Sequence, residues 1–135
     1  MELATVEHPL IGVKQFDKKG RGIVALRDIA KGRLIERCPV LVIPAEDRGR
    51  VDPSVVFTYV FMWEHGTTEQ DLYAGTGRSA IALGLTSLLN HSYEPNAEFI
   101  RHIDALEIEV RARRLIRRGE EITIDYQMDL WFVPY

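Results

Sequence analysis

The stretch that decides the fold is residues 90–96, Asn-His-Ser-Tyr-Glu-Pro-Asn, read together with residues 119–126, Gly-Glu-Glu-Ile-Thr-Ile-Asp-Tyr. The first string contains Asn, Ser and Pro, which bond to nearby backbone or stop a helix. It therefore predicts a polar turn after the apolar residues 85–89. The second string predicts a strand that ends in a tyrosine. A hydrogen-bonding corner and a rigid strand that aims one side chain are suited to holding a cofactor beside a reacting group.

Both strings, in this order, resemble the two sequence motifs of the SET domain, the fold of a large class of protein lysine methyltransferases. The resemblance is clearest from about residue 20 to residue 126. It implies a mainly β fold, a β-clip of several small sheets with little helix, in which the C-terminal segment passes beneath an earlier loop as a pseudoknot. That threading would bring Asn90 and His91 next to Tyr126.

The resemblance also implies roles for individual residues. In the family the Asn-His pair and a Gly-x-Gly segment contact S-adenosylmethionine. This implies Asn90 and His91 as cofactor-binding residues, together with Gly20, Arg21 and Gly22. The middle residue of the Gly-x-Gly segment is often aromatic in the family, whereas here it is Arg21. The simpler interpretation of these glycines is a hairpin turn.

The resemblance assigns Tyr126 to the catalytic centre. Its hydroxyl would orient a lysine amine rather than act as a base, because an ordinary tyrosine is protonated at neutral pH. The simpler interpretation is a half-buried strand tyrosine, which is common in β proteins.

The C-terminal tail, residues 127–135, is rich in aromatic side chains. Many larger relatives carry a cysteine-rich zinc segment after the tyrosine, and this chain lacks one. We expect Trp131 to cover the adenine as a cofactor-binding residue, and Phe132 and Tyr73 to line the substrate channel, since aromatic side chains offer a flat apolar face. Ordinary core packing is the alternative for all three residues.

Size and composition predict a single SET domain over residues 1–135. Hydrophobic residues make up 46% of the chain, charged residues make up 27%, and the net charge is −3. This balance argues against a general nucleic-acid binder and suits a basic protein substrate that bears lysine, such as a histone or histone-like protein. No apolar run is long enough to span a membrane and no signal peptide is evident, so we expect a cytoplasmic protein. The single cysteine, Cys38, predicts a buried strand residue, and no histidine pair has metal-ligand spacing.

Alternating hydrophobicity predicts many short strands. The expected elements are strands 10–16 and 23–26 across a turn at 20–22, strands 34–36 and 40–43 separated by Pro39, a part-helical and part-strand segment 55–63, one helical turn within 80–89, a hairpin of 97–103 with 106–110, and a last strand 122–126. Residues 25–35 echo residues 112–122 at an offset of 87, the difference between 112 and 25. The echo predicts two similar β-turns around glycine.

The leading hypothesis is a protein-lysine N-methyltransferase that uses S-adenosylmethionine and needs no metal. The alternative is a non-catalytic module that keeps the SET scaffold for protein binding, which is motivated by Leu88-Leu89 where the family often has Arg-Phe. A third interpretation is a nucleic-acid interaction protein built on an arginine cluster that otherwise forms a solvated edge (Arg111, Arg113, Arg114, Arg117 and Arg118). The apolar segment 55–63 also makes a homodimer an expectation, since a second copy would cover it.

Overall fold

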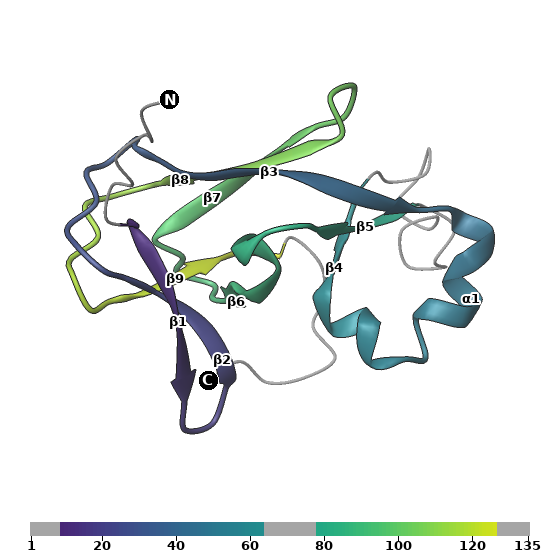
Figure 1. The fold of residues 1–135 in the computed structure, drawn as a ribbon, viewed down its shortest axis with the longest axis horizontal. Coiled ribbons are helices and arrows are strands. Elements are labelled where there is room, and N and C mark those ends of the chain that lie inside the picture. Colours follow the sequence, from purple (N-terminus) through teal and green to yellow (C-terminus); the bar gives the residue numbers. More distant parts are fainter. Residues whose placement is uncertain (1–8, 64–77, 127–135) are drawn as a thin grey trace, which may run out of the picture.

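The computed structural model describes residues 9–63 and 78–126, which form mostly short strands with little helix (Figure 1). The mainly β fold expected from the sequence is confirmed. One sheet has the order β1-β2-β9-β6 and the other has the order β4-β5-β3-β8-β7. The strands are β1 (Ile11–Phe16), β2 (Gly20–Ala25), β3 (Leu34–Ile43), β4 (Val60–Met62), β5 (Ser79–Ala82), β6 (Asn90–His91), β7 (Ala97–His102), β8 (Glu107–Ala112) and β9 (Glu121–Ile124).

Short helical turns connect β3 to β4 and β5 to β6. They are η1 (Ala45–Asp47), α1 (Arg48–Val51), η2 (Val55–Tyr59) and η3 (Leu85–Leu88). No helix among the described residues is long and apolar enough to cross a membrane.

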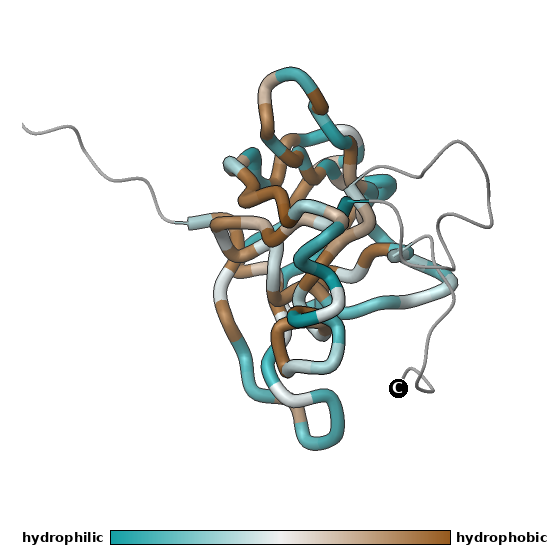
Figure 2. Tube along the Cα trace, turned by 90° about the vertical axis from the view of Figure 1, so that its right-hand side faces the viewer, coloured by the Kyte–Doolittle hydropathy of each residue, from teal (hydrophilic) through white to brown (hydrophobic). Residues whose placement is uncertain are grey.

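The described residues form a hydrophobic core that lies between the two sheets. It joins Ile23 and Ile122 of the first sheet to Val40, Phe61 and Val110 of the second. The hydropathy view agrees, because brown segments gather in the middle of the molecule while the turn of the lowest hairpin, β1–β2, is teal (Figure 2). Burial of these apolar side chains is the main term that stabilises the fold.

The two similar segments, residues 25–35 and 112–122, lie side by side and form backbone hydrogen bonds with each other. Ile29 and Ile116 exchange backbone hydrogen bonds of 2.8 and 2.9 Å, and both side chains are fully buried. The N–H of Ala25 donates to the carbonyl of Glu120 at 2.9 Å. The residues at the equivalent positions of the two copies, 87 apart in the sequence, form the equivalent bond: the N–H of Ala112 donates to the carbonyl of Arg33 at 3.0 Å. The prediction of two similar β-turns is confirmed. The structure adds that they are related by a local pseudo-two-fold axis between the two isoleucines.

Each copy turns at a glycine in the left-handed region. The φ angle is +84° at Gly32 and +90° at Gly119, where a side chain would be strained. The same symmetry extends into the sheets. Leu34 pairs with Arg111 and Val24 pairs with Glu121, and the two pairs are equivalent because 34 and 121, like 24 and 111, differ by 87. This paired unit joins the two sheets and sets where β9 begins.

The sequence prediction of a break at Pro39 is wrong, since β3 runs without interruption from Leu34 to Ile43. The N–H of Val40 points to β8 and donates to Leu106. The nitrogen of Pro39 therefore points to the opposite side, toward β5, because successive backbone groups alternate in a ladder. The N–H of Leu83, one residue beyond the last paired residue of β5, donates to the carbonyl of Pro39 at 2.9 Å. Proline is tolerated there because its missing N–H costs only the last bond of the ladder.

The predicted turn at residues 20–22 is also misplaced. Gly20, Arg21 and Gly22 open β2, and the turn lies at residues 17–19. Segment 55–63 is part helical and part strand as predicted. Phe61, Met62 and Trp63 are buried within the fold, whereas Val55 is 73% exposed, and the homodimer stays a prediction. Cys38 is a buried residue of β3 as predicted, and burial, followed by the Glu36 charge, raises the pKa of its thiol to about 11.

The pseudo-two-fold pair makes a prediction about stability. Ile29→Ala and Ile116→Ala should each lower the free energy of unfolding by about 2–5 kcal/mol, because each change leaves a cavity at the same fully buried contact. Leu115→Ala is the matched control, because Leu115 is 42% exposed. Urea unfolding followed by circular dichroism measures all three variants. Equal small effects would contradict the proposed importance of this contact.

Candidate functional site

Two segments far apart in the sequence meet through β6 and β9, which are parallel. Asn90 pairs with Thr123 and His91 pairs with Ile124, and the N–H of Ser92 donates to the carbonyl of Ile124 at 2.9 Å. A two-residue strand offers few ladder bonds, so other contacts must hold this pair together. The juxtaposition of Asn90 and His91 with Tyr126 that the pseudoknot implied is confirmed.

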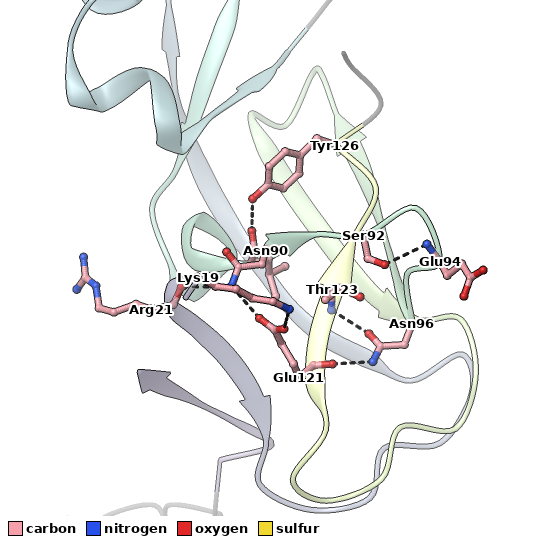
Figure 3. A network of polar contacts seen from close by, with 10 residues as sticks. Lys19, Arg21, Asn90, Ser92, Glu94, Asn96, Glu121, Thr123 and Tyr126 are labelled. Carbon is pink, nitrogen blue, oxygen red and sulfur yellow. Dashed lines mark hydrogen bonds and ion pairs between the residues drawn. The ribbon is translucent and has the colours of Figure 1, made fainter. Parts of the chain in front are cut away.

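Asn96 supplies one of those contacts with a buried side chain. Its Nδ2 donates to the carbonyl of Glu121 at 2.8 Å, and its Oδ1 accepts from the N–H of Thr123 at 2.9 Å (Figure 3). The amide thus bonds to β9 as a neighbouring strand would. The sequence motif includes Asn96, but residue patterns gave no reason for this role.

Tyr126 is held in place through both its backbone and its side chain where it meets Asn90 and His91, and we call this junction the corner. Its N–H donates to His91 Nδ1 at 2.9 Å, and its hydroxyl donates to the carbonyl of Leu89 at 2.5 Å. Its ring packs edge-on against Phe61 at 6.1 Å and against His91 at 5.1 Å between centroids. Burial, followed by the charge of Glu121, raises the pKa of Tyr126 to about 12. The phenol therefore keeps its proton at neutral pH and lies fixed next to Asn90 (Figure 3).

The His91 imidazole is neutral and has a defined tautomer. Burial lowers its pKa from 6.5, although the Asp125 carboxylate, 3.8 Å from Nδ1, acts in the opposite direction. Nδ1 accepts a hydrogen bond from the backbone, so the proton lies on Nε2. Nε2 is buried and has no hydrogen-bond partner in the described parts of the chain. A buried donor without a partner is a feature that a bound molecule can satisfy.

Asn90 lies in a polar cluster that the sequence only partly indicated. Its Nδ2 donates to Glu121 Oε2 at 2.7 Å and to the carbonyl of Arg21 at 3.4 Å, and Lys19 Nζ lies 2.5 Å from Glu121 Oε1. Glu121 was expected to support its strand or face solvent, but its side chain is only 12% exposed. Periodicity along β9 cannot reveal this role, because the partners come from β6 and from the β1–β2 turn.

The Gly-x-Gly segment contributes its backbone to this cluster. A Cβ on Gly22 would lie 2.7 Å from both Asn90 Nδ2 and Glu121 Oε2, so only glycine allows this close approach. Gly20 has a positive φ of 75° and open space around it. The Arg21 side chain is exposed and points away from the cluster, and only its carbonyl contacts Asn90 (Figure 3).

Sequence reasoning missed Glu36, which anchors the segment leading into the corner. Its Oε1 accepts from the N–H of Thr86 at 2.8 Å and from the Thr86 hydroxyl at 2.6 Å, and Oε2 accepts from the N–H of Leu85 at 3.3 Å. These bonds hold the start of η3, whose end delivers Leu89 and Asn90. The alternating pattern of β3 gave no signal for this contact, because Thr86 is distant in the sequence.

Three predicted site residues, Tyr73, Trp131 and Phe132, lie outside the described residues. Within residues 9–63 and 78–126, no group of three or more His, Cys, Asp or Glu side chains is arranged to hold a metal ion.

Solved structures share this fold. The Neurospora SET domain protein DIM-5, a histone lysine methyltransferase, aligns with a TM-score of 0.65 and 20% identity over 93% of this chain and 55% of its own. A chain of ctPRC2 in an autoinhibited conformation bound to S-adenosylmethionine aligns with a TM-score of 0.64 and 20% identity over 87% of this chain and 15% of its own. These likenesses establish the class of fold, a SET domain.

Sequence comparison identifies the family. The model of the SET domain matches residues 20–127, so this chain belongs to the SET domain family. A histone-lysine N-methyltransferase of Schizosaccharomyces pombe, H3 lysine-37 specific, is 29% identical over 98% of this chain and 82% of its own length. A histone-lysine N-methyltransferase of Eremothecium gossypii, H3 lysine-36 specific, is 34% identical over 91% of this chain, which spans only 18% of that protein. These relatives support lysine methylation as the general activity.

The His91 geometry predicts a pH dependence of stability. The pKa of His91 in the folded chain lies below 6.5, its ordinary value in the unfolded chain. As pH falls below 6.5 the unfolded chain binds a proton that the folded chain does not. The free energy of unfolding therefore falls, by at most about 1.4 kcal/mol per pH unit, until the folded pKa is passed.

Urea unfolding between neutral and mildly acidic pH measures this effect. His91→Gln keeps a side-chain acceptor but cannot titrate, so its stability should fall less over the same range. An identical slope in both proteins would show that His91 does not titrate as described.

Proposed function

We propose that this protein transfers a methyl group from S-adenosylmethionine to the side-chain amine of a lysine in a basic protein, such as a histone or a histone-like protein. The observation that carries the proposal is the fixed position of Tyr126, whose hydroxyl donates a hydrogen bond to the carbonyl of Leu89, the residue before Asn90. We further propose that residues 1–135 form one SET domain. The family match over residues 20–127 and the hydrophobic core shared by both sheets support this.

The residues at the corner fit the cofactor that the family implies. His91 Nε2 is a buried donor without a partner in the described chain, and Gly22 lets the backbone of β2 lie close to Asn90 and Glu121. Asn90 Nδ2 already donates to Glu121 and to the carbonyl of Arg21, so its Oδ1 is the atom available to accept a hydrogen bond, which suits the amino group on the edge of an adenine. We assign Asn90, His91 and the backbone of residues 20–22 to holding the cofactor, which supplies a methyl group activated on a sulfonium.

The chemistry requires a neutral lysine amine, and no side chain at the corner acts as its base. Tyr126 stays protonated because the pKa of its phenol is raised to about 12. The lone pair of neutral His91, on Nδ1, already accepts a hydrogen bond from the N–H of Tyr126. The amine therefore loses its proton to solvent, and apolar surroundings such as Phe61 favour this step because they destabilise the ammonium ion.

Tyr126 orients the amine by hydrogen bonding. Its hydroxyl proton is committed to Leu89, so its oxygen lone pairs remain free to accept from the incoming N–H. Fixed positioning of the nucleophile is a large source of acceleration in a displacement reaction. The double anchoring of Tyr126 through its N–H and its hydroxyl provides that rigidity.

Tyr126→Phe tests this role. Turnover should fall by about 10²-fold or more, as for loss of a positioned catalytic hydrogen-bonding group. The affinity for S-adenosylhomocysteine should stay nearly unchanged, because the ring contacts with Phe61 and His91 are kept. The measurement is transfer of a labelled methyl group to a panel of basic proteins. Tyr93→Phe is the matched control, because Tyr93 also touches the His91 ring but is 66% exposed.

Two results would contradict the proposal. Equal turnover of the Tyr126→Phe variant and the unchanged protein would remove Tyr126 from the catalytic role. Cofactor binding without labelling of any basic protein would favour the non-catalytic SET-scaffold module instead.

Gly22→Ala tests the proposed cofactor corner. The new methyl group would displace Asn90 or Glu121, so the affinity for S-adenosylmethionine should fall by about tenfold, the equivalent of one lost hydrogen bond. Gly49→Ala is the control, because a Cβ there meets no atom within 4 Å. Titration calorimetry with S-adenosylmethionine and S-adenosylhomocysteine measures both variants. Unchanged affinity in Gly22→Ala would place the cofactor elsewhere.

A further inference from the structure

The internal pairing of the two echoing turns gathers basic side chains on one edge of the molecule. Segments 25–33 and 112–120 lie side by side where β2 leads into β3 and β8 leads into β9 (Figure 1). Their isoleucines point into the core, and their basic residues are exposed. We call this surface the basic edge, and it consists of Arg27, Lys31, Arg33, Arg113, Arg114, Arg117 and Arg118.

The charge of the basic edge opposes that of the rest of the chain. The two segments contain seven basic residues and two acidic residues, a balance of five positive charges. The whole chain carries −3, so the remainder carries eight net negative charges. Six of these charges lie outside the described residues, so the described remainder, with ten basic and twelve acidic residues, carries two net negative charges. The positive charge is therefore concentrated on the basic edge.

Most of the basic edge has no counter-charge in the structure. Arg114 pairs with Glu120 and Arg117 lies 3.5 Å from Asp28. The other five side chains form no ion pair within the described chain, and these are Arg27, Lys31, Arg33, Arg113 and Arg118. Elsewhere Lys19, Arg37 and Arg48 each have a carboxylate partner. Clustered like charges repel each other, so a bound polyanion would stabilise this edge.

We infer that the basic edge is a docking surface for the phosphate backbone of duplex DNA. Six of the seven side chains are arginines, whose planar guanidinium matches phosphate oxygens and forms paired hydrogen bonds. Duplex DNA offers one negative charge per about 1.7 Å of helix axis, a density that suits several side chains on one edge. The contacts are to phosphates, so binding is independent of base sequence.

The grouping of the unpaired charges supports DNA rather than an acidic protein as the occupant. The five side chains without an ion pair come from two short segments that hydrogen-bond to each other, so they belong to one surface. A regular polyanion can meet several such side chains at once. The rest of the described chain is nearly balanced, with ten basic and twelve acidic residues, so it does not repel a polyanion strongly.

Binding to a labelled mixed-sequence DNA duplex, measured by fluorescence anisotropy at several salt concentrations, tests the inference. If the five unpaired side chains each meet a phosphate, the slope of log affinity against log salt should be about −4 to −5. The variant Arg33→Gln, Arg113→Gln, Arg118→Gln should bind more weakly, with a slope shallower by about 3 units. The control Lys14→Gln, Lys18→Gln, Arg50→Gln removes the same charge outside the basic edge and should keep the slope.

Three outcomes would overturn the inference. They are no binding by the unchanged protein at low salt, an equal loss of slope in the control variant, and binding of polyglutamate as tight as binding of DNA. The last result would assign the edge to an acidic protein. Because Tyr126 is not part of the edge, Tyr126→Phe should bind DNA normally, which separates failure of this inference from failure of the proposed function.

A second measurement rests on the proposed function. With a basic protein complexed to DNA as the methyl acceptor, the variant lacking Arg33, Arg113 and Arg118 should show a raised KM and an unchanged kcat. With the same protein free of DNA, the two enzymes should have equal KM. A raised KM on the free protein would mean that the edge binds the acceptor protein itself, and would contradict a role in DNA docking.

Discussion

The parallel contact between β6 and β9 is the interaction on which the rest of the site depends. Every other strand pair among the described residues is antiparallel, and β6 has only two residues. A ladder this short contributes little by itself. Side chains complete it, because Asn96 bonds to the backbone of β9 and His91 accepts from the N–H of Tyr126. The residues that define the candidate site are therefore also the residues that hold these strands together.

This double use limits the chemistry that the corner can perform. A histidine whose lone pair is bonded to the backbone cannot accept a substrate proton without loosening Tyr126. A phenol with a pKa of about 12 cannot act as a base near neutral pH. What remains is a rigid set of hydrogen-bonding groups next to the aromatic ring of Phe61. Such a site positions a nucleophile that reacts once it is neutral, which is consistent with an amine and not with a hydroxyl that needs a strong base.

The sequence predicted the parts of this fold that depend on local pattern. It predicted the β7–β8 hairpin, the mixed segment 55–63 and the two glycine turns, since each follows from alternation or from turn chemistry. It misjudged Pro39, because tolerance of a proline depends on where the neighbouring strand ends. The roles of Glu36 and Glu121 were also missed, because both side chains bond to residues that are distant in the sequence. The meeting of Asn90 with Tyr126 came from family resemblance, which no periodicity could replace.

The internal pseudo-two-fold relation links the core to the surface. In each copy an isoleucine points inward and pairs across the axis, which directs the flanking residues of the turn to solvent. Three of those residues in one copy and four in the other are basic, so the same pairing that joins the sheets also brings both sets of charges together. Net charge alone argued against contact with nucleic acid, but net charge averages over the surface. A fold that concentrates its positive charge on one edge can attract a polyanion there although the whole chain is acidic, because charges farther away than the screening length of the salt contribute little to the field at that edge.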